Sequence, residues 1–185
     1  MTTIQHRILA ATLLSGVAAG ACAAGEAAEP WHVSNSQLGP VSAQTAFDRD
    51  TIAALLPEFR VVETEAWSEG MAYPVIEARR QAGGETDIVF DGQGERLLAV
   101  RIRSAGLVEA AADIGDQAGE AGIVSDQCYA GMEERSGDVH CLDPSVSGLS
   151  YWIGVDYAGP DGALPPRDVI LSGTVYEIAW QTVSR

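Results

Sequence analysis

The sequence predicts an α+β domain that consists mainly of antiparallel sheet, with one or two short helices. Three observations predict this class. Segments that alternate apolar and polar residues recur from about residue 59 onward, as half-buried strands do. One short segment near residue 50 has apolar residues at helical spacing. The regular strand–helix alternation of a parallel sheet does not occur.

The predicted helix follows Thr45. Ile52, Leu55 and Leu56 recur at helical spacing, and Pro57 ends the segment. Thr45 and Asp48 have the spacing of a capping box, which predicts Thr45 as the residue that caps the helix. A Gly/Ala-rich stretch at residues 106–122 is predicted to be partly helical, although its glycines weaken it.

The strands are predicted from residue composition and alternation. Residues 60–66, 73–80 and 86–90 are rich in Val, Ile, Thr and aromatic side chains. A turn over residues 91–94 then leads to a strand over residues 96–103, in which Leu98, Val100 and Ile102 share one face.

Two further strands follow. Residues 149–155 alternate again, and a Gly/Pro-bearing loop over residues 158–167 separates them from the last strand. That last strand is predicted to place Tyr176, Ile178 and Trp180 on one face, toward the core.

The first 21 residues have the pattern of a secretory signal peptide. A mildly basic start precedes an uncharged apolar run over residues 8–19, and small residues follow it. This run is shorter than the about 20 residues that a permanent membrane span needs. We therefore expect residues 1–21 to be a signal peptide, residues 22–36 a tether and residues 37–185 one domain.

Cys22 ends this leader. Ala19-Gly20-Ala21 before it resembles a lipobox, which predicts that Cys22 is acylated and becomes the mature amino terminus. Ordinary cleavage after Ala23 is the alternative, since residues 21–23 also form an A-x-A site. Lipidation predicts a bacterial envelope protein anchored with its domain facing the periplasm, at the outer rather than the inner membrane.

Cys128 and Cys141 belong to the predicted domain. In an oxidising periplasm, two cysteines at this spacing are expected to form a disulfide, near the tip of a hairpin. Two free buried thiols are the alternative, which that compartment disfavours.

The charge balance limits the partners. The formal net charge is −15, and the basic residues are all arginine. Such a chain repels nucleic-acid backbones and anionic lipid surfaces, so we expect no nucleic-acid partner and membrane contact only through the lipid.

Several motifs together resemble one family. They are Leu38-Gly-Pro-Val41, the helix closure at residues 55–57, the cysteine pair with Gly131 and Gly137 between, and GPDGALP at residues 159–165 before Trp180. In these the chain resembles the RpoE-regulated lipoprotein family, a bacterial envelope domain of unknown function, from about Leu38 onward. The resemblance implies a lipoprotein and an α+β fold, and it brings no active site.

The sequence offers little for catalysis. Beyond the leader the histidines are His32, in the predicted tether, and His140, and no nucleophile motif accompanies them. With Cys128 and Cys141 paired, zinc lacks ligands, so we expect no metal and no cofactor. We therefore interpret the protein as a non-catalytic envelope lipoprotein, a binding module whose partner is an envelope protein or a cell-wall component.

Two sets of residues are predicted to bind. Asp161 and Leu164 lie in the loop that prolines stiffen, a setting that lowers the entropy cost of binding. Ser172 and Tyr176 form an SGxxY motif, which resembles the inhibitory loop of membrane-bound lysozyme inhibitors. A periplasmic lysozyme inhibitor and a hydrolase with an unrecognised carboxylate site are therefore the alternative functions.

Overall fold

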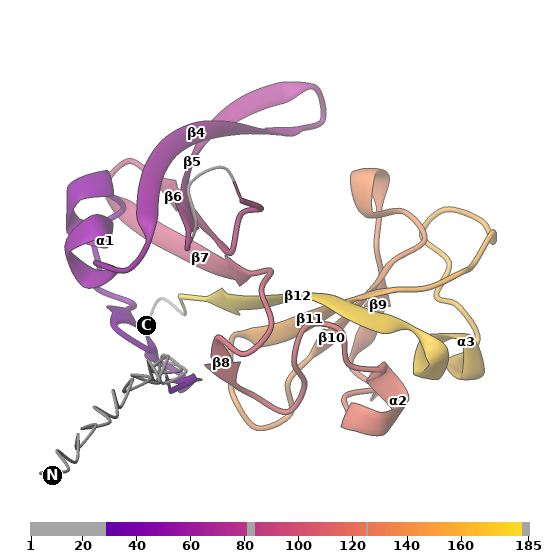
Figure 1. Cartoon of the computed structure of the whole chain (residues 1–185). Helices are drawn as coiled ribbons and strands as arrows, with labels where there is room; N and C mark the ends of the chain where they lie inside the picture. The colour runs from indigo at the N-terminus through magenta and orange to yellow at the C-terminus, as the bar shows by residue number, and fades with distance from the viewer. Residues whose placement is uncertain (1–28, 81–83, 125, 183–185) are drawn as a thin grey trace, which may run out of the picture.

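The computed structural model describes residues 29–80, 84–124 and 126–182. Within these ranges the chain forms one eight-stranded antiparallel sheet, in the strand order β4-β5-β6-β7-β12-β11-β10-β9 (Figure 1). Its strands are β4 (Arg60–Ser68), β5 (Met71–Arg79), β6 (Ile88–Gln93), β7 (Arg96–Ile102), β9 (Cys128–Ala130), β10 (Val139–Leu142), β11 (Leu149–Gly154) and β12 (Thr174–Gln181).

Shorter elements surround this sheet. Two small strand pairs join β1 (Trp31–His32) to β8 (Val108–Glu109) and β2 (Gln37–Leu38) to β3 (Val41–Ser42). The helices in the described ranges are α1 (Arg49–Leu55), α2 (Ala118–Ala121), α3 (Arg167–Ser172) and the 3-10 helix η1 (Glu133–Arg135). The predicted α+β class is confirmed, but the described residues hold three α-helices rather than one or two.

The last of these helices, α3, was not predicted because Pro165 and Pro166 mark a loop. The loop ends at Pro166, whose extended backbone immediately precedes the helix. Ile170 of α3 is buried in the core, so packing stabilises a helix of only six residues. The Gly/Ala-rich stretch contributes only α2, a single turn that Gly122 ends with a positive φ of 70°.

Helix α1 begins later than the capping box predicts. Its cap is Asp48, whose side chain accepts a hydrogen bond from the Thr51 backbone N–H at 2.8 Å. The Thr45 hydroxyl instead accepts a hydrogen bond from the backbone N–H of Ser42 at the end of β3. The predicted C-terminal end is confirmed, since the last helical residue is Leu55 and Ile52 and Leu56 are buried.

A β-bulge changes which residues of β7 face the core. The register between β6 and β7 shifts between Asp91 and Gly92, which leaves Leu98 without a direct partner. Leu97 is therefore buried with Val100, whereas Leu98, predicted to share a face with Val100 and Ile102, is exposed. The predicted turn at residues 91–94 is also wrong, because β6 continues to Gln93 and the chain reverses at residues 94–95.

The predicted tether is too long. Trp31 and His32 form β1 and pair with β8, and Val33 is buried in the core. The indole N–H of Trp180 also donates to the backbone carbonyl of Ser34 at 2.9 Å. The folded part thus includes residues 31–36, while the predicted signal peptide and Cys22 lie outside the described residues.

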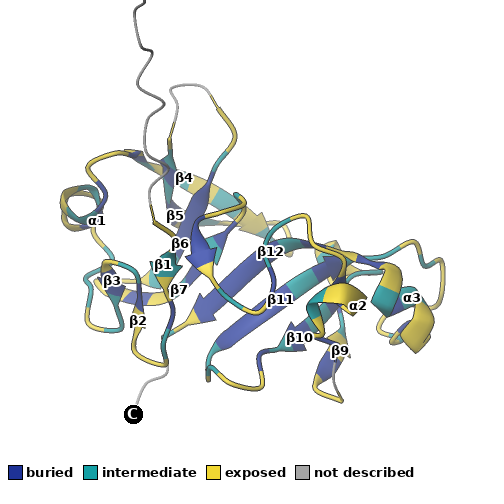
Figure 2. Ribbon diagram, turned by 60° about the horizontal axis from the view of Figure 1, so that its bottom comes forward, coloured by how far each residue is buried: buried dark blue, intermediate teal, exposed yellow. Residues whose placement is uncertain are grey.

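The two faces of the sheet differ in chemistry. One face packs against the α-helices and small strand pairs, and buried residues run along its central strands (Figure 2). Its buried side chains include Ile102, Tyr151, Ile178 and Trp180. The β4–β5 hairpin and the connection between β9 and β10 that carries η1 both rise on the other side of β12 (Figure 1). That second side carries the charged residues described next.

Candidate functional site

A buried carboxylate lies at the centre of the polar face. Glu177 follows Tyr176 in β12 and its side chain has no solvent exposure. The Arg103 Nε donates to Glu177 Oε2 at 2.8 Å, and the Arg135 Nη2 donates to Oε1 at 2.7 Å. Because each oxygen has a cationic donor, the charge that burial would otherwise penalise is compensated.

Arg135 connects η1 to the sheet beneath it. Its guanidinium lies 4.5 Å from the centre of the Trp152 ring, and its Nη1 donates to the Tyr176 hydroxyl at 2.7 Å. The Tyr176 hydroxyl in turn donates to Asp138 Oδ2 at 2.6 Å. Burial opposes the charge of Arg135, but the Glu177 carboxylate and the Tyr176 hydroxyl together outweigh it and raise the pKa of Arg135. Arg135 therefore anchors segment 132–138 to strands β11 and β12.

His140 completes this cluster. Its ring stacks on Trp152, its neighbour on β11, with 4.6 Å between ring centres. Burial and the charge of Arg135 lower the pKa of His140. The imidazole is therefore neutral at pH 7 and acts as a flat packing partner in this cluster.

The tip of the β4–β5 hairpin meets η1 above this cluster. The backbone N–H of Glu69 donates to Glu134 Oε1 at 2.7 Å, across 65 residues of sequence. Nearby, the Ser136 hydroxyl donates to Asp161 Oδ1 at 2.7 Å, which joins the Gly/Pro loop to the same place. We call this surface the rim and define it as residues 67–71, residues 132–136 and Asp161.

Carboxylates are crowded at the rim. The negative charge of Glu69 is the largest influence on Glu133, and with those of Glu134 and Asp161 it raises the pKa of Glu133. The pKa of Glu134 is lowered instead, because its carboxylate accepts the Glu69 backbone hydrogen bond. Glu69 and Glu133 are also the described non-glycine residues with positive φ, at 51° and 54°.

Large apolar side chains are exposed at the same rim. Trp67 and Met71 of the hairpin tip are 67% and 66% exposed, and Met132 before η1 is 63% exposed. Isolated exposed apolar residues are common on proteins, but these three lie on two segments that contact one another through Glu69 and Glu134. The rim therefore combines exposed apolar side chains with negative charge. Part of its backbone, residues 132–136, is anchored to the sheet through Arg135.

Comparison with known proteins places the chain in a family. A family described as "Protein of unknown function (DUF1131)" matches residues 26–182. The chain belongs to this family. The predicted membership of a bacterial domain family of unknown function is confirmed at this level, whereas regulation by RpoE stays a prediction.

A solved structure shares the fold of this DUF1131 chain. The uncharacterized protein yfeY from Escherichia coli aligns with a TM-score of 0.65 and 20% sequence identity. The alignment covers 81% of this chain and 99% of that one. No curated protein matches the chain.

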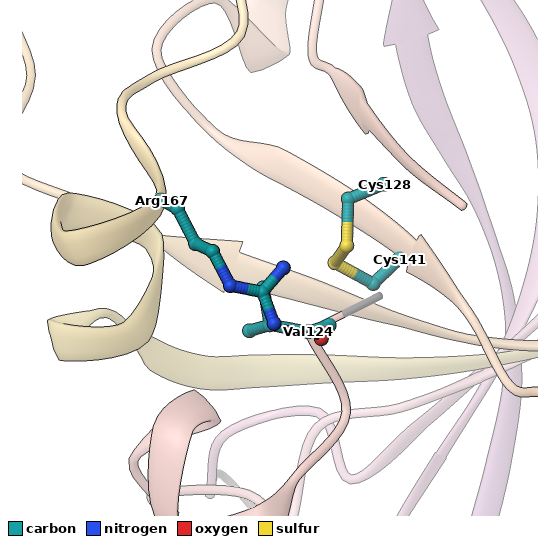
Figure 3. The surroundings of a disulfide bond; sticks show 4 residues. All are labelled: Val124, Cys128, Cys141 and Arg167. Atoms are coloured by element: carbon teal, nitrogen blue, oxygen red, sulfur yellow. Dashed lines mark hydrogen bonds between the residues drawn. A yellow bond between two sulfur atoms is a disulfide. The ribbon is translucent and has the colours of Figure 1, made fainter. Parts of the chain in front are cut away.

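The disulfide predicted for this DUF1131 chain is confirmed. Cys128 on β9 and Cys141 on β10 lie directly opposite one another and are bonded (Figure 3). The bond does not lie near the tip of the hairpin, as predicted, but at the end of the strand pair away from the connecting loop. It ties the edge strand β9 into the sheet and closes a loop that, by chain entropy, stabilises the fold by about 3 kcal/mol.

The predicted binding residues of the Gly/Pro loop are separated by the structure. Asp161 belongs to the rim, through Ser136. Leu164 is exposed but lines a cavity of about 280 Å³ with Cys128 and Ile170, near the Arg167 side chain that donates to the Val124 carbonyl (Figure 3). Asp161 and Leu164 therefore lie on different surfaces.

The SGxxY motif does not form a protruding loop. Ser172 ends α3 and its hydroxyl donates to the Val169 carbonyl at 2.9 Å. Tyr176 is the unpaired residue of a β-bulge in β12, because Trp152 pairs with Glu177 and Ile153 with Val175. Val175 therefore takes the core position predicted for Tyr176. Because the Tyr176 hydroxyl already bonds Arg135 and Asp138, the geometry does not favour the lysozyme-inhibitor alternative.

Three other features bear on the function, namely a metal site, a membrane-spanning helix and a pair of catalytic carboxylates. Among the described residues, no group of three or more His, Cys, Asp or Glu side chains is placed to hold a metal ion. No helix in those ranges is long and apolar enough to cross a membrane. Glu69 and Glu133, the carboxylates that interact most closely at the rim, are exposed to solvent and lie in no enclosed cleft formed by the described part of the chain, so the geometry of the rim does not favour a hydrolase site there.

Proposed function

We propose that this protein is a non-catalytic binding module of the bacterial envelope and that its partner docks on the rim. The observation that carries this proposal is the exposure of Trp67, Met71 and Met132. The two segments that carry these residues are joined by the hydrogen bond from the Glu69 backbone to Glu134. Aromatic and methionine side chains are enriched in the buried cores of interfaces. A surface that is ordered before binding loses less conformational entropy when it docks.

The module is proposed to be held at the membrane by lipid on Cys22. The lipobox-like sequence before Cys22 and the signal pattern of residues 1–21 support this anchor. Two acyl chains or more on one residue hold a protein on a bilayer stably, as a single chain does not. The outer membrane is the proposed site, with the domain in the periplasm.

Replacing Cys22 with Ser tests the anchor. The wild-type chain is expected to sediment with membranes and to incorporate labelled palmitate, because the thiol is the acylated group. Cys22→Ser is expected to lose the label and to leave the membrane fraction. Incorporation of no label into the wild-type chain would replace lipidation by cleavage at the A-x-A site.

Recovery of the partner from solubilised envelopes tests the binding surface. Trp67→Ala is expected to weaken binding by about 2 kcal/mol, roughly 30-fold, as truncation of an interface tryptophan does. Leu98→Ala is the matched control, because Leu98 is also an exposed large apolar residue but lies in β7, away from the rim. Equal loss with Leu98→Ala, or turnover of a cell-wall substrate by the purified protein, would refute the proposal.

A further inference from the structure

We infer that the partner segment received by the rim is a cationic stretch of protein that carries an apolar side chain. This inference rests on the proposed function, because it names the chemistry of the partner at the same surface. Three observations support it: the arrangement of the apolar side chains, the carboxylates around them, and the internal bonds of Arg135, which keep its charge from balancing those carboxylates.

The hairpin tip offers apolar contact on both of its faces. In the β4–β5 register Trp67 lies opposite Ala72 and Met71 lies opposite Ser68. Side chains of successive strand positions project to opposite faces, so Trp67 and Met71 project to opposite sides of the tip. Met132 lies immediately before η1, which the tip contacts through Glu69 and Glu134. A partner segment that crosses the tip can therefore bury an apolar side chain against it.

The carboxylates of the rim are not balanced by the arginine of the same segment. Arg135 is turned inward, where Glu177 and Tyr176 take its donors. Glu69, Glu133 and Asp161 thus present negative charge around the exposed apolar side chains. A lysine or arginine from a partner would relieve the repulsion that these carboxylates exert on one another.

Other occupants fit this chemistry less well. A second copy of the chain would bring two acidic rims together, in a protein whose net charge is −15. An anionic lipid surface or a phosphate backbone would be repelled for the same reason. A cationic protein segment is the occupant that matches both the apolar and the charged groups.

Site-specific photo-crosslinking in cells tests this inference with the full chain. A photo-crosslinking amino acid replaces Met71 in one variant and Leu98 in a control variant, and captured peptides are sequenced by mass spectrometry. The rim position is expected to capture segments with net positive charge, and the control position is not. Adding Glu69→Gln and Glu133→Gln is expected to reduce this capture several-fold. These changes keep the Glu134 carboxylate that accepts the Glu69 backbone hydrogen bond.

The outcomes separate the inference from the function on which it rests. Capture of acidic or neutral segments, of a second copy, of lipid or of glycan would overturn the inference and leave a binding function at the rim. Capture that the Gln substitutions do not reduce would also overturn it. No adduct at the rim, or equal adducts at the control position, would overturn both.

Discussion

A fully buried glutamate is stable at position 177 because the fold brings cations to it from two directions. Arg103 follows β7 and Arg135 comes from η1, so Glu177 links the centre of the sheet to the rim. Burying an ion pair does not by itself add stability, since desolvation offsets the attraction. Here the ion pair between Glu177 and Arg135 positions a segment, because it attaches η1 and the residues beside it to the sheet.

Glu133 and Glu134 are neighbours, yet they are expected to respond oppositely to neutralisation. The pKa of Glu133 is raised in the folded chain, chiefly by the charge of Glu69. Folding therefore favours its protonated form, and the stability linked to it falls as the pH rises through that raised pKa. Glu133→Gln is expected to raise the melting temperature at pH 7 by at most a few degrees.

The pKa of Glu134 is lowered, because its carboxylate accepts the Glu69 backbone hydrogen bond. The stability linked to Glu134 is therefore present above its unfolded pKa and is lost as the pH falls through the folded value. Glu134→Gln is expected to lower the melting temperature at pH 7. The melting temperatures of both variants should approach that of the wild type as the pH falls below the folded pKa of each carboxyl. Shifts of the same sign at pH 7 would contradict the contact between the hairpin tip and η1.

At the scale of elements, alternation predicted the strands well and their registers poorly. The strands from β4 to β7, β11 and β12 all follow from composition and period 2. The bulge that leaves Leu98 of β7 unpaired does not follow from period 2, because nothing in the alternation marks the register shift between Asp91 and Gly92. Gly92 itself packs against the ring of Phe47, a residue remote in sequence, where a Cβ would lie only 2.1 Å from that ring. A bulge moves one residue to the other face of the sheet, as it does for Leu98.

The rim was only partly predictable for the same reason. Asp161 was identified from the stiff loop that contains it, and Glu133 and Glu134 are recognisable only as a polar turn. The contact from Glu69 to Glu134 spans 65 residues, and no local pattern encodes it. Alternation predicts Tyr176 in the core because it carries no information about the β-bulge at Tyr176 itself. The disulfide was predictable because its prediction needs only the expected oxidising compartment and the number of cysteines, and no knowledge of register.

At the scale of the whole molecule, β12 joins the two halves of the sheet. It pairs with β7 on one side and with β11 on the other, so the β4–β5 hairpin and the β9–β10 connection belong to opposite ends. Both ends nevertheless meet above the polar face, at the rim. The sheet therefore brings the two segments of the rim together and leaves their apolar side chains exposed. The central claim of the proposed function is that a partner docks on this surface.

Hydrogen–deuterium exchange in native envelopes tests that claim most directly, because it needs no prior identification of the partner. The full chain is labelled in envelope membranes and after purification in detergent, and the exchange of its peptides is compared. Residues 66–72 and 131–138 are predicted to exchange more slowly in membranes, since a docked partner covers them. Equal exchange of both segments in the two preparations, or protection confined to another surface, would contradict the claim.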